Sequence, residues 1–464
     1  STFASQNESK QNMKMTKYKL GELVEVTRGA SLSGQFYAEE GKLIRLTLGN
    51  FNMNGGGFKE NTSKTDLYFT GTVRDEFILN KGDIITPLTE QSLGLLGTTA
   101  RIPESGKYIQ SQDVALVRCK EGLLDPNFCY YLISSSIVRQ QLSAAAQQTK
   151  IRHTSPEKIK DCTIWVPDFY TQKNIGRILT DIDNKIAINR RINDNLEAMA
   201  KQLYEYWFVQ FDFPNEEGKP YKSSGGAMVW NEKLKREIPQ GWNILPISDI
   251  LDKYPTTKRY ETKEYLQIGK YPIIDQGDAY IVGFTNENDN LLTRHPAVLF
   301  GDHSTKVKFL DFDFARGADG TQILYSSNDA VSQYYLYLVV SALQIPNPGY
   351  SRHFKYLKEL PIVIPSLSIA TKFVNIVKPL FEKWTKNIFN NIALTKQRDE
   401  LLPLLMNGQA SVNYHLSAKA YPLPIAYKKA MPIEANQIIS STFIQKLDSH
   451  IPSPRLQTSQ IRCS

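Results

Sequence analysis

Residues 160–211 read KDCTIWVPDFYTQKNIGRILTDIDNKIAINRRINDNLEAMAKQLYEYWFVQF, and the strongest structural signal of the sequence lies here. From Tyr170 to Phe211 it contains no proline, and its single glycine is Gly176. About 42 helical residues at ~1.5 Å per residue would span about 60 Å. Apolar side chains and two asparagines recur at alternating steps of four and three residues, at Ile175, Leu179, Ile182, Ile186, Asn189, Asn193, Leu196, Ala200, Leu203 and Trp207. A seam of this period is typical of a long helix that packs lengthwise against a second helix.

The second helix is present in the chain as a repeat. Residues 358–405 read KELPIVIPSLSIATKFVNIVKPLFEKWTKNIFNNIALTKQRDELLPLL and match the first stretch at one constant offset of 198 positions. The matched pairs are Lys160/Lys358, Ile164/Ile362, Pro167/Pro365, Ile178/Ile376, Lys185/Lys383, Asn189/Asn387, Asn193/Asn391, Leu196/Leu394 and Leu203/Leu401. Agreement at a single offset indicates a duplicated unit. We therefore predict an α+β protein in which two globular domains are separated by two long helices.

The two asparagine pairs predict how these helices meet. A polar residue on an apolar seam costs stability and specifies the register. If the helices form an antiparallel coiled coil about a pseudo-twofold axis, Asn189 should face Asn391 and Asn193 should face Asn387. The alternative is that these asparagines are simply exposed. Pro379 lies inside the second stretch, and we expect it to kink or interrupt that helix.

The composition is that of a globular chain with a mild positive charge. It has 464 residues, 41% of them hydrophobic, which is enough for two to four domains with sizeable cores. Its 55 basic and 47 acidic residues give a net charge of +8, which favours a polyanionic partner without requiring one. The four cysteines lack CxxC spacing, so we expect a reduced, cytoplasmic protein without a disulfide framework or zinc site. No apolar run is long enough for a membrane span, and the polar first residues do not resemble a signal peptide.

The repeat divides the chain into alternating globular and helical parts. We expect a flexible lead-in, a first domain, the first long helix, a linker, a second domain, the second long helix and a tail of unknown role, with bounds at 1–16, 17–160, 161–212, 213–240, 241–357, 358–410 and 411–464. Leu20 and Ile247 open the two domains at comparable places. The interval from Leu20 to Ile164 is 144 residues, whereas that from Ile247 to Ile362 is 115. The domains thus share a frame but differ in length and sequence.

Short β-like runs separated by glycine-rich breaks dominate both domains. In the first domain we expect strands at 20–26, 43–48, 76–79, 83–86 and 113–118. A helix should follow at 125–146, with Asp125 as N-cap and Pro126 at its first position. In the second domain we expect strands at 273–275, 280–284, 297–300, 307–310 and 321–325, and a helix at 329–342. A basic stretch precedes each long helix, at 147–153 and 350–355.

Motifs that carry chemistry are missing. The chain has no GxxxxGK[ST] sequence for nucleotide phosphates. Asp125–Phe128 and Asn347–Tyr350 superficially resemble the (Asn/Asp)-Pro-Pro-(Tyr/Phe) motif of amino-methyltransferases, but both lack the second proline, and a turn or helix cap explains them. Glu40–Lys42 and Glu217–Lys219 lack the upstream Pro-Asp of a nuclease site, and the histidines have no metal-ligand spacing. The sequence therefore favours recognition over catalysis.

Together these features resemble the specificity subunit of type I restriction-modification systems over residues 18–410. The most specific stretches are IAINRRINDNLEAMAKQLYEYWFVQF at 186–211, YKSSGGAMV at 221–229, IPQGW at 238–242, GDH at 301–303, GADG at 317–320 and GYSRHFK at 349–355. The resemblance implies two target-recognition domains, each reading one half of a bipartite double-stranded DNA target. It also implies that this chain supplies specificity only, without catalytic residues or cofactors of its own. Two modification subunits with S-adenosylmethionine, and two restriction subunits with ATP and Mg²⁺, would assemble around it.

A rigid pair of helices would make the spacing of the half-sites part of the sequence that is read. Modules on one duplex should read half-sites about one helical turn apart, ~34 Å or ~10 base pairs. Because the two domains are unequal, the half-sites should differ and the target should not be a palindrome.

Contacts to DNA phosphates should come from basic side chains and backbone N–H groups, and contacts to bases from Arg, Lys, Asn or Gln. The candidates are Arg28, Lys59, Lys64, Arg101, Gln148, Lys150 and Arg152 in the first domain, and Lys258, Arg259, His303, Lys306, Lys308, Arg352, His353 and Lys355 in the second. The alternative for each is a solvated surface residue. The stretches before the long helices are the stronger candidates, because basic residues occur there in both halves.

The first long helix also carries apolar residues off the seam, at Ile178, Ile188, Ile192, Met199 and Tyr206. Docking of a modification subunit and cover by a neighbouring domain explain them equally well. Two other functions stay open. A protein–protein scaffold would bind DNA without a preferred site, and a single-chain enzyme would itself bind S-adenosylmethionine.

Overall fold

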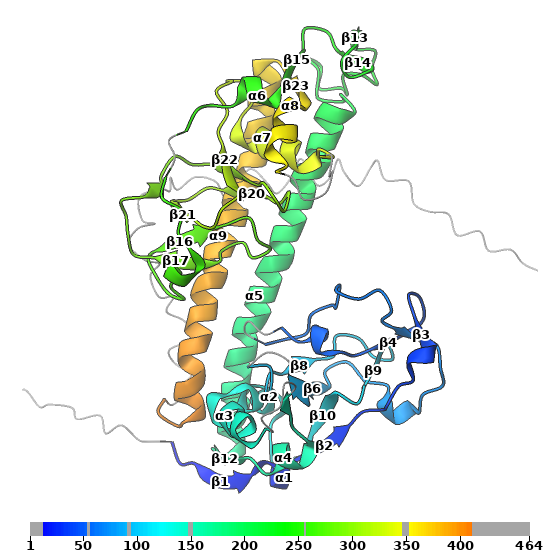
Figure 1. Ribbon diagram of the computed structural model, residues 1–464, viewed down its shortest axis with the longest axis vertical. Helices are drawn as coiled ribbons and strands as arrows, with labels where there is room; N and C mark the ends of the chain where they lie inside the picture. The colour runs from blue at the N-terminus through cyan, green and yellow to red at the C-terminus, as the bar shows by residue number, and fades with distance from the viewer. Residues whose placement is uncertain are drawn as a thin grey trace, which may run out of the picture. The chain divides into compact units, whose positions relative to one another are not determined.

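The computed structural model describes residues 13–52, 56–90, 94–146, 152–254, 257–345 and 352–410 (Figure 1). The expected tail at 411–464 and most of the lead-in at 1–16 lie outside these ranges. All described residues belong to one compact unit of the chain. None of the helices in the described part combines the length and the apolar character that a membrane crossing requires.

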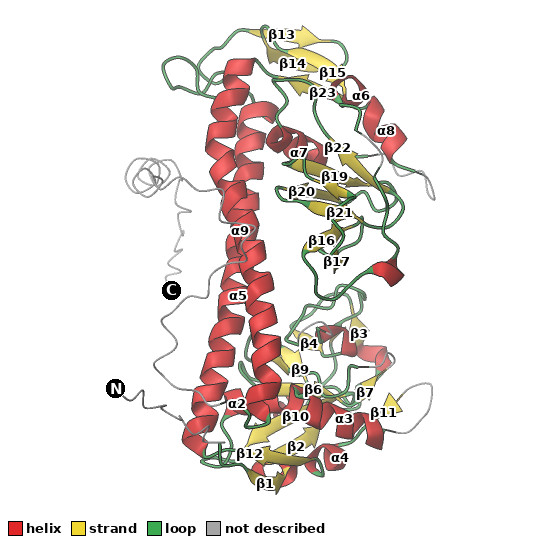
Figure 2. Ribbon diagram, turned by 90° about the vertical axis from the view of Figure 1, so that its left-hand side faces the viewer, coloured by secondary structure: helices red, strands yellow, loops and turns green. Residues whose placement is uncertain are grey.

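Two long helices, α5 (Phe169–Tyr204) and α9 (Leu367–Met406), pack against each other along the unit (Figure 2). Each begins at a capping side chain: Asp168 Oδ1 accepts from Thr171 N at 3.0 Å, and Ser366 Oγ accepts from Ile369 N at 3.4 Å. Such caps satisfy N–H groups that the first helical turn leaves unpaired. The first helix therefore starts later than residue 161, and it ends in a π-helical turn (Glu205–Val209).

The seam asparagines pair as their matched positions predict. Asn189 Nδ2 donates to Asn391 Oδ1, and Asn387 Nδ2 donates to Asn193 Oδ1, both at 2.8 Å. The residue that comes earlier on α5, Asn189, pairs with the one that comes later on α9, Asn391, so the two helices are antiparallel. Asn387 is 1% exposed, and therefore the alternative of four simply exposed asparagines is wrong.

The expected interruption at Pro379 does not occur, because α9 continues through Pro379 and again through Pro403. Proline removes the hydrogen bond to the carbonyl four residues earlier, which belongs to Asn375. Pro379 and Asn375 are both exposed. Water can reach the freed carbonyl on this outer face, so the helix persists.

The first domain consists of short strands and helices in the order β1 (Thr16–Lys19), α1 (Leu20–Leu23), β2 (Val24–Arg28), β3 (Tyr37–Ala38), β4 (Leu43–Arg45), β5 (Tyr68–Phe69), β6 (Ile84–Pro87), β7 (Thr89–Glu90), β8 (Ala100–Arg101), β9 (Tyr108–Ile109), β10 (Val114–Cys119), α2 (Pro126–Ser134), α3 (Ser136–Ala145), β11 (Arg152–His153), α4 (Pro156–Lys160) and β12 (Thr163–Val166). Three 3₁₀ turns lie at Gly34–Phe36, Leu48–Asn50 and Asp75–Phe77. Its sheets have the strand orders β2-β10-β6-β8, β3-β5-β4-β9, β11-β7 and β1-β12. Buried Ile85, Leu116 and Tyr108 belong to the core between them.

The second domain follows in the order β13 (Met228–Asn231), β14 (Arg236–Pro239), β15 (Asn243–Pro246), α6 (Ile247–Ile250), β16 (Tyr271–Ile274), β17 (Gly283–Thr285), β18 (Leu291–Leu292), β19 (Ala297–Gly301), β20 (Val307–Leu310), β21 (Phe314–Arg316), β22 (Thr321–Leu324), α7 (Gln333–Ala342), α8 (Phe354–Glu359) and β23 (Pro361–Ile364). A 3₁₀ turn lies at Thr262–Glu264. Its sheets have the orders β17-β16-β21-β18, β20-β19-β22, β15-β23 and β13-β14. Its core includes Trp207 and Phe208 from the end of α5 and Phe373 from the start of α9.

Several expected elements differ from those observed. Residues 20–26 form the short helix α1 and only then a strand, and residues 75–77 form a 3₁₀ turn where a strand was predicted. The helix expected at 125–146 is capped by Asp125 but breaks at Ser135 into α2 and α3. The helix expected from 329 begins at Gln333, because Ser332 caps it.

The duplicated unit is larger than the long helix alone. In each half a helix, a strand and a long helix follow one another: α4-β12-α5 and α8-β23-α9. The strand pairs antiparallel with a strand near the start of its domain, β12 with β1 and β23 with β15. Each domain is thereby closed by strands from its two ends, and the second of these strands leads directly into a long helix.

A tyrosine fastens each domain to α5. Tyr131 of α2 donates to Asp183 Oδ2 at 2.6 Å, and Arg398 of α9 donates to Asp183 Oδ1 at 2.8 Å. Tyr337 of α7 donates to Glu197 Oε1 at 2.8 Å. Burial and the neighbouring carboxylates raise the pKa of both tyrosines, so they stay protonated as donors. These contacts orient both domains on the helix pair.

Candidate nucleic-acid interface

In both domains the segment before the short helix α4 or α8 reaches back to the loop that follows a central strand. In the first domain Thr154 N donates to Leu88 O at 2.8 Å, just after β6, and β11 pairs with β7. In the second domain His353 N donates to Asp302 O and Phe354 N donates to Asp302 Oδ1, both at 2.8 Å, just after β19. The two domains therefore build an equivalent corner, and each corner includes the described end of a basic stretch, residues 152–153 or 352–355.

The corner of the second domain gathers three candidates around Asp319. Arg259 Nη1 pairs with Asp319 Oδ1, and Arg352 Nη2 lies 3.8 Å from Asp319 Oδ2. His303 is exposed beside them, and its backbone N–H donates to Gln276 Oε1 at 2.9 Å. The Gly320 N–H and the Arg259 guanidinium lower the pKa of Asp319, which keeps this carboxylate charged. Arg259, His303 and Arg352 thus form a mainly basic exposed surface.

The GADG sequence explains the tight turn of this corner. Gly320 has a φ of +81°, a conformation that suits glycine. A Cβ there would lie 2.4 Å from Gln276 Nε2 and 2.7 Å from His303 Cδ2. Gln276 Nε2 instead donates to Asp319 O at 2.7 Å. This side-chain amide therefore stabilises the loop through a hydrogen bond within the protein.

Two second-domain candidates lie inside the protein, which corrects the expectation that they are presented to DNA. Lys308 Nζ donates to Asp275 O at 2.8 Å and Ala279 O at 2.5 Å, with its side chain 7% exposed. Burial lowers the pKa of Lys308 to about 8. His353 is also buried, against Asp302. The loop at 275–279 covers the face of β20 that the strand pattern predicts to be open.

The remaining second-domain candidates are exposed but mostly paired. Lys258 bridges Glu264 at 3.1 Å and Glu287 at 3.2 Å, and Lys306 pairs with Asp278 at 2.5 Å. Lys355 lies 4.6 Å above the Tyr356 ring. Neighbouring carboxylates thus offset the charges of Lys258 and Lys306.

In the first domain Arg152 turns inward to a carboxylate that sequence analysis missed. Arg152 Nη1 lies 3.1 Å from Glu90 Oε1, with side-chain exposures of 18% and 2%. Glu90 Oε2 accepts from the backbone N–H groups of Gly94, Leu95 and Leu96 at 3.1, 2.9 and 3.0 Å. Arg152 is therefore a structural residue of this corner more than a free phosphate contact.

The other first-domain candidates are not brought together. Arg28 Nε donates to Gln112 O at 2.8 Å, and Arg101 stacks 4.8 Å from the Tyr130 ring. Lys59 and Lys64 are exposed on the segment between β4 and β5. Gln148 and Lys150 lie outside the described residues.

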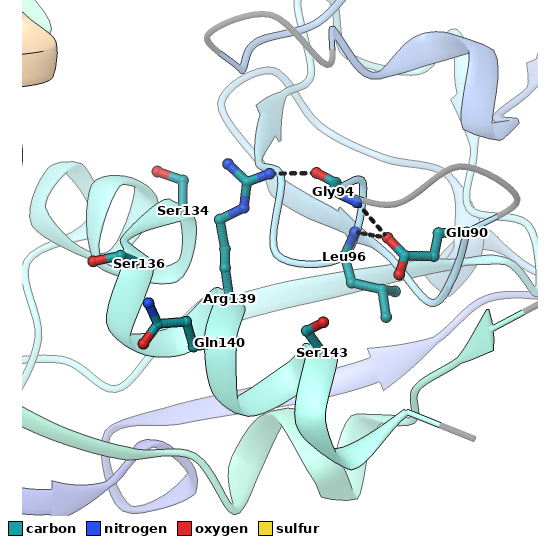
Figure 3. A pocket seen from close by; sticks show the side chains of 8 residues that line it. All are labelled: Glu90, Gly94, Leu96, Ser134, Ser136, Arg139, Gln140 and Ser143. Atoms are coloured by element: carbon teal, nitrogen blue, oxygen red, sulfur yellow. Dashed lines mark hydrogen bonds between the residues drawn. The ribbon is translucent and has the colours of Figure 1, made fainter. Parts of the chain in front are cut away.

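A hollow of 360 Å³ lies at the first-domain corner, between the β7–β8 loop and α3 (Figure 3). Its lining residues are Glu90, Gly94, Leu96, Ser134, Ser136, Arg139, Gln140 and Ser143. The sequence signal was available: Ser136, Arg139, Gln140 and Ser143 recur at helical spacing on a single face of α3. Among the described residues, no cluster of three or more His, Cys, Asp or Glu side chains is arranged to hold a metal ion.

Comparison with known proteins identifies relatives of this architecture. The family model of the type I restriction modification DNA specificity domain matches residues 12–198 and 239–394. The specificity subunit of the type I restriction enzyme MjaIX from Methanocaldococcus jannaschii is 26% identical over 318 residues, covering 63% of this chain and 71% of that subunit. The specificity subunit of the enzyme HindI from Haemophilus influenzae is 22% identical over 387 residues, covering 65% and 81%.

The fold is also present among solved structures. The S subunit of a type I restriction-modification system from M. genitalium superimposes with a TM-score of 0.51 at 19% sequence identity, covering 85% of this chain and 97% of that one. At this identity the likeness concerns the fold alone.

Proposed function

This chain belongs to the family of type I restriction-modification DNA specificity domains, and we propose that it selects a bipartite, asymmetric DNA target for such a system. Each globular domain reads one half-site, and the helix pair separates the two. The target is unequal because the domains are unequal: the basic corner of the second domain is built from loops, whereas the corner of the first is built around α3.

The observation that carries this proposal is the pairing of Asn189 with Asn391 and of Asn193 with Asn387. Buried polar contacts on an apolar seam fix the register of two helices. Each domain is fastened to that seam, through Tyr131 or Tyr337. The distance between the reading corners is therefore fixed by the helices, which allows a spacer that is counted but not read. Half-sites about one turn of duplex apart, ~34 Å, suit this arrangement.

The outer face of α5 supports assembly with modification subunits. Ile188 is 55% exposed, Met199 49% and Tyr206 38%, and Ile192 is partly exposed on the same face. Spacings of 4, 7 and 7 residues place these four side chains in one stripe along the helix. The alternative of cover by a neighbouring domain does not account for these exposures within the described part of the chain. Two modification subunits carrying S-adenosylmethionine and two restriction subunits using ATP and Mg²⁺ would supply the chemistry, in the cytoplasm where the DNA lies.

Mapping methylated adenines tests the proposal. The full chain is expressed with its modification subunit in a host without adenine methylation, and the methylated sites are sequenced. We expect two different half-sites separated by a spacer of constant length. A continuous or palindromic target would contradict the proposal, and binding to DNA without any preferred site would favour a protein–protein scaffold.

A further inference from the structure

We propose that α3 is the recognition helix of the first domain and that Arg139 and Gln140 read base edges of the first half-site. This inference rests on the proposed function and names the residues that carry it out. Neither residue was among the candidates from sequence.

The polar face of α3 is open to a ligand. Ser136, Gln140 and Ser143 are exposed, and Arg139 is half-buried and extends from α3 toward Gly94 (Figure 3). The opposite face is buried through Val138 and Leu142, which anchors the helix in the domain. A helix presented in this way fits the major groove of a duplex.

The position of the hollow in the fold points to the same role. It lies between α3 and the β7–β8 loop, where β7 comes shortly after β6 and pairs with the Arg152 segment. The equivalent loop after β19 carries His303, beside Arg259 and Arg352 of the second domain. Two corners built by the same duplicated frame would face one duplex in the same manner, so the hollow occupies the reading position of its domain.

The walls of the hollow are held in place before any ligand binds. The buried Glu90 carboxylate collects the N–H groups of residues 94–96, and Arg139 Nη2 donates to Gly94 O. Arg152 connects Glu90 to α3, because its Nη2 donates to Ser143 Oγ at 3.1 Å. This network orients the Arg139 guanidinium. A guanidinium has five N–H donors, and the hydrogen bond to Gly94 O occupies one of them among the described residues, so donors remain for a bidentate contact to a base.

The chemistry of these side chains selects among bases. Arginine pairs bidentately with guanine O6 and N7, and glutamine with adenine N6 and N7. Within the described residues of the second domain, α7 offers no comparable polar face, because Tyr334–Val340 are buried. We therefore expect a guanine at the Arg139 position of the first half-site, read from a helix, whereas the second half-site is read from loops.

The experiment compares methylated motifs made by the full chain in complex with its modification subunit. The variants are Arg139→Lys, which keeps the charge but not the planar fork, and Gln140→Ala, which changes an exposed side chain. Arg74→Ala is the matched control, since Arg74 is 74% exposed in the same domain and is not a lining residue of the hollow. A Gln140→Cys variant, tested against duplexes with a thiol-bearing base, assigns the half-site that α3 touches.

Both test variants should relax base preference within one half-site by about 10- to 100-fold, and the cysteine should cross-link to that same half-site. The control should keep the wild-type motif. Unchanged motifs in both variants would overturn the inference, as would changes confined to the half-site that does not cross-link. Uniform loss of methylation in both variants but not in the control would assign α3 a structural role and would also overturn it. If the wild-type complex itself yields no bipartite motif, the proposed function fails independently of α3.

Discussion

Asn387 is the seam residue whose replacement tests the register most directly. Its Nδ2 donates to Asn193 Oδ1 at 2.8 Å, and Asn193 Nδ2 donates to Trp384 O at 3.0 Å. Asn387→Ala would leave Asn193 Oδ1 without its donor in a site where Asn193 is only 8% exposed. A buried polar group without a partner costs about 1–3 kcal/mol. The variant should lower the free energy of unfolding of the helix pair by that amount.

Removing both partners should cost less than the two single losses combined. In Asn193→Ala/Asn387→Ala neither amide is stranded, so the loss should fall short of the sum by about 0.5–3 kcal/mol. Urea unfolding followed by far-UV circular dichroism compares the three variants with the wild type. The control is Asn195→Ala, which replaces an exposed asparagine on α5, the helix that carries Asn193. It should change the free energy of unfolding by about 0.5 kcal/mol or less. Additive losses would refute pairing across the seam.

Three further predictions concern packing, pH and salt. Gly176→Ala should destabilise the protein by about 1–3 kcal/mol in urea unfolding, although alanine favours helices, because its Cβ would lie 2.6 Å from Phe128 N; a stabilised variant would contradict this. Burial lowers the pKa of Lys308 from 10.5 to about 8. Between these two pH values, Lys308 is therefore protonated in the unfolded chain but deprotonated in the folded chain. Wild-type stability should therefore rise across that window by about 3 kcal/mol relative to Lys308→Met, and parallel pH profiles in urea unfolding would exclude this. A plot of log affinity for target DNA against log salt concentration has a negative slope, and Arg352→Ala should make it shallower by about 0.9. Lys308→Met should leave this slope unchanged. Equal slopes for Arg352→Ala and the wild type in binding titrations would show that Arg352 does not contact DNA phosphate.

The helix pair could be predicted from sequence because its signal is long and repeated. The asparagines recur at one offset of 198 positions, and a seam leaves little freedom in how two such helices meet. The strands gave weaker signals, since several span only two or three residues. Residues 20–23 illustrate the difficulty: LGEL is apolar enough for a strand but forms a helical turn closed by Lys19 N donating to Glu22 Oε1 at 2.6 Å.

The candidate site was predictable in place but not in detail. Arg352, in the described part of the stretch before α8, does lie at the basic corner. Whether a given Lys or Arg side chain faces solvent, however, depends on contacts between segments that are distant in the sequence. Lys308 is a charged residue within the apolar strand β20 and was expected to face solvent, but its Nζ donates to the carbonyls of Asp275 and Ala279. Arg152 is captured by Glu90, which is 62 positions away. Local sequence patterns do not predict such contacts between residues that are distant in the sequence. The polar face of α3, by contrast, is a local pattern that the sequence could have revealed.

In the proposed function, one set of residues determines the base preference of each half-site, and a different set determines the distance between the half-sites. The spacing depends on the asparagine pairs and on the fastening tyrosines, whose partners Asp183 and Glu197 both lie on α5. The reading corners are held instead by contacts within each domain, through Glu90 in the first and Asp302 in the second. A substitution at Gln140 or Arg352 therefore alters no seam hydrogen bond, and under the proposed function we expect it to leave the distance between the half-sites unchanged. Since sites that share no partners contribute additively, base preference in one half-site can change while the spacer and the other half-site stay as they are.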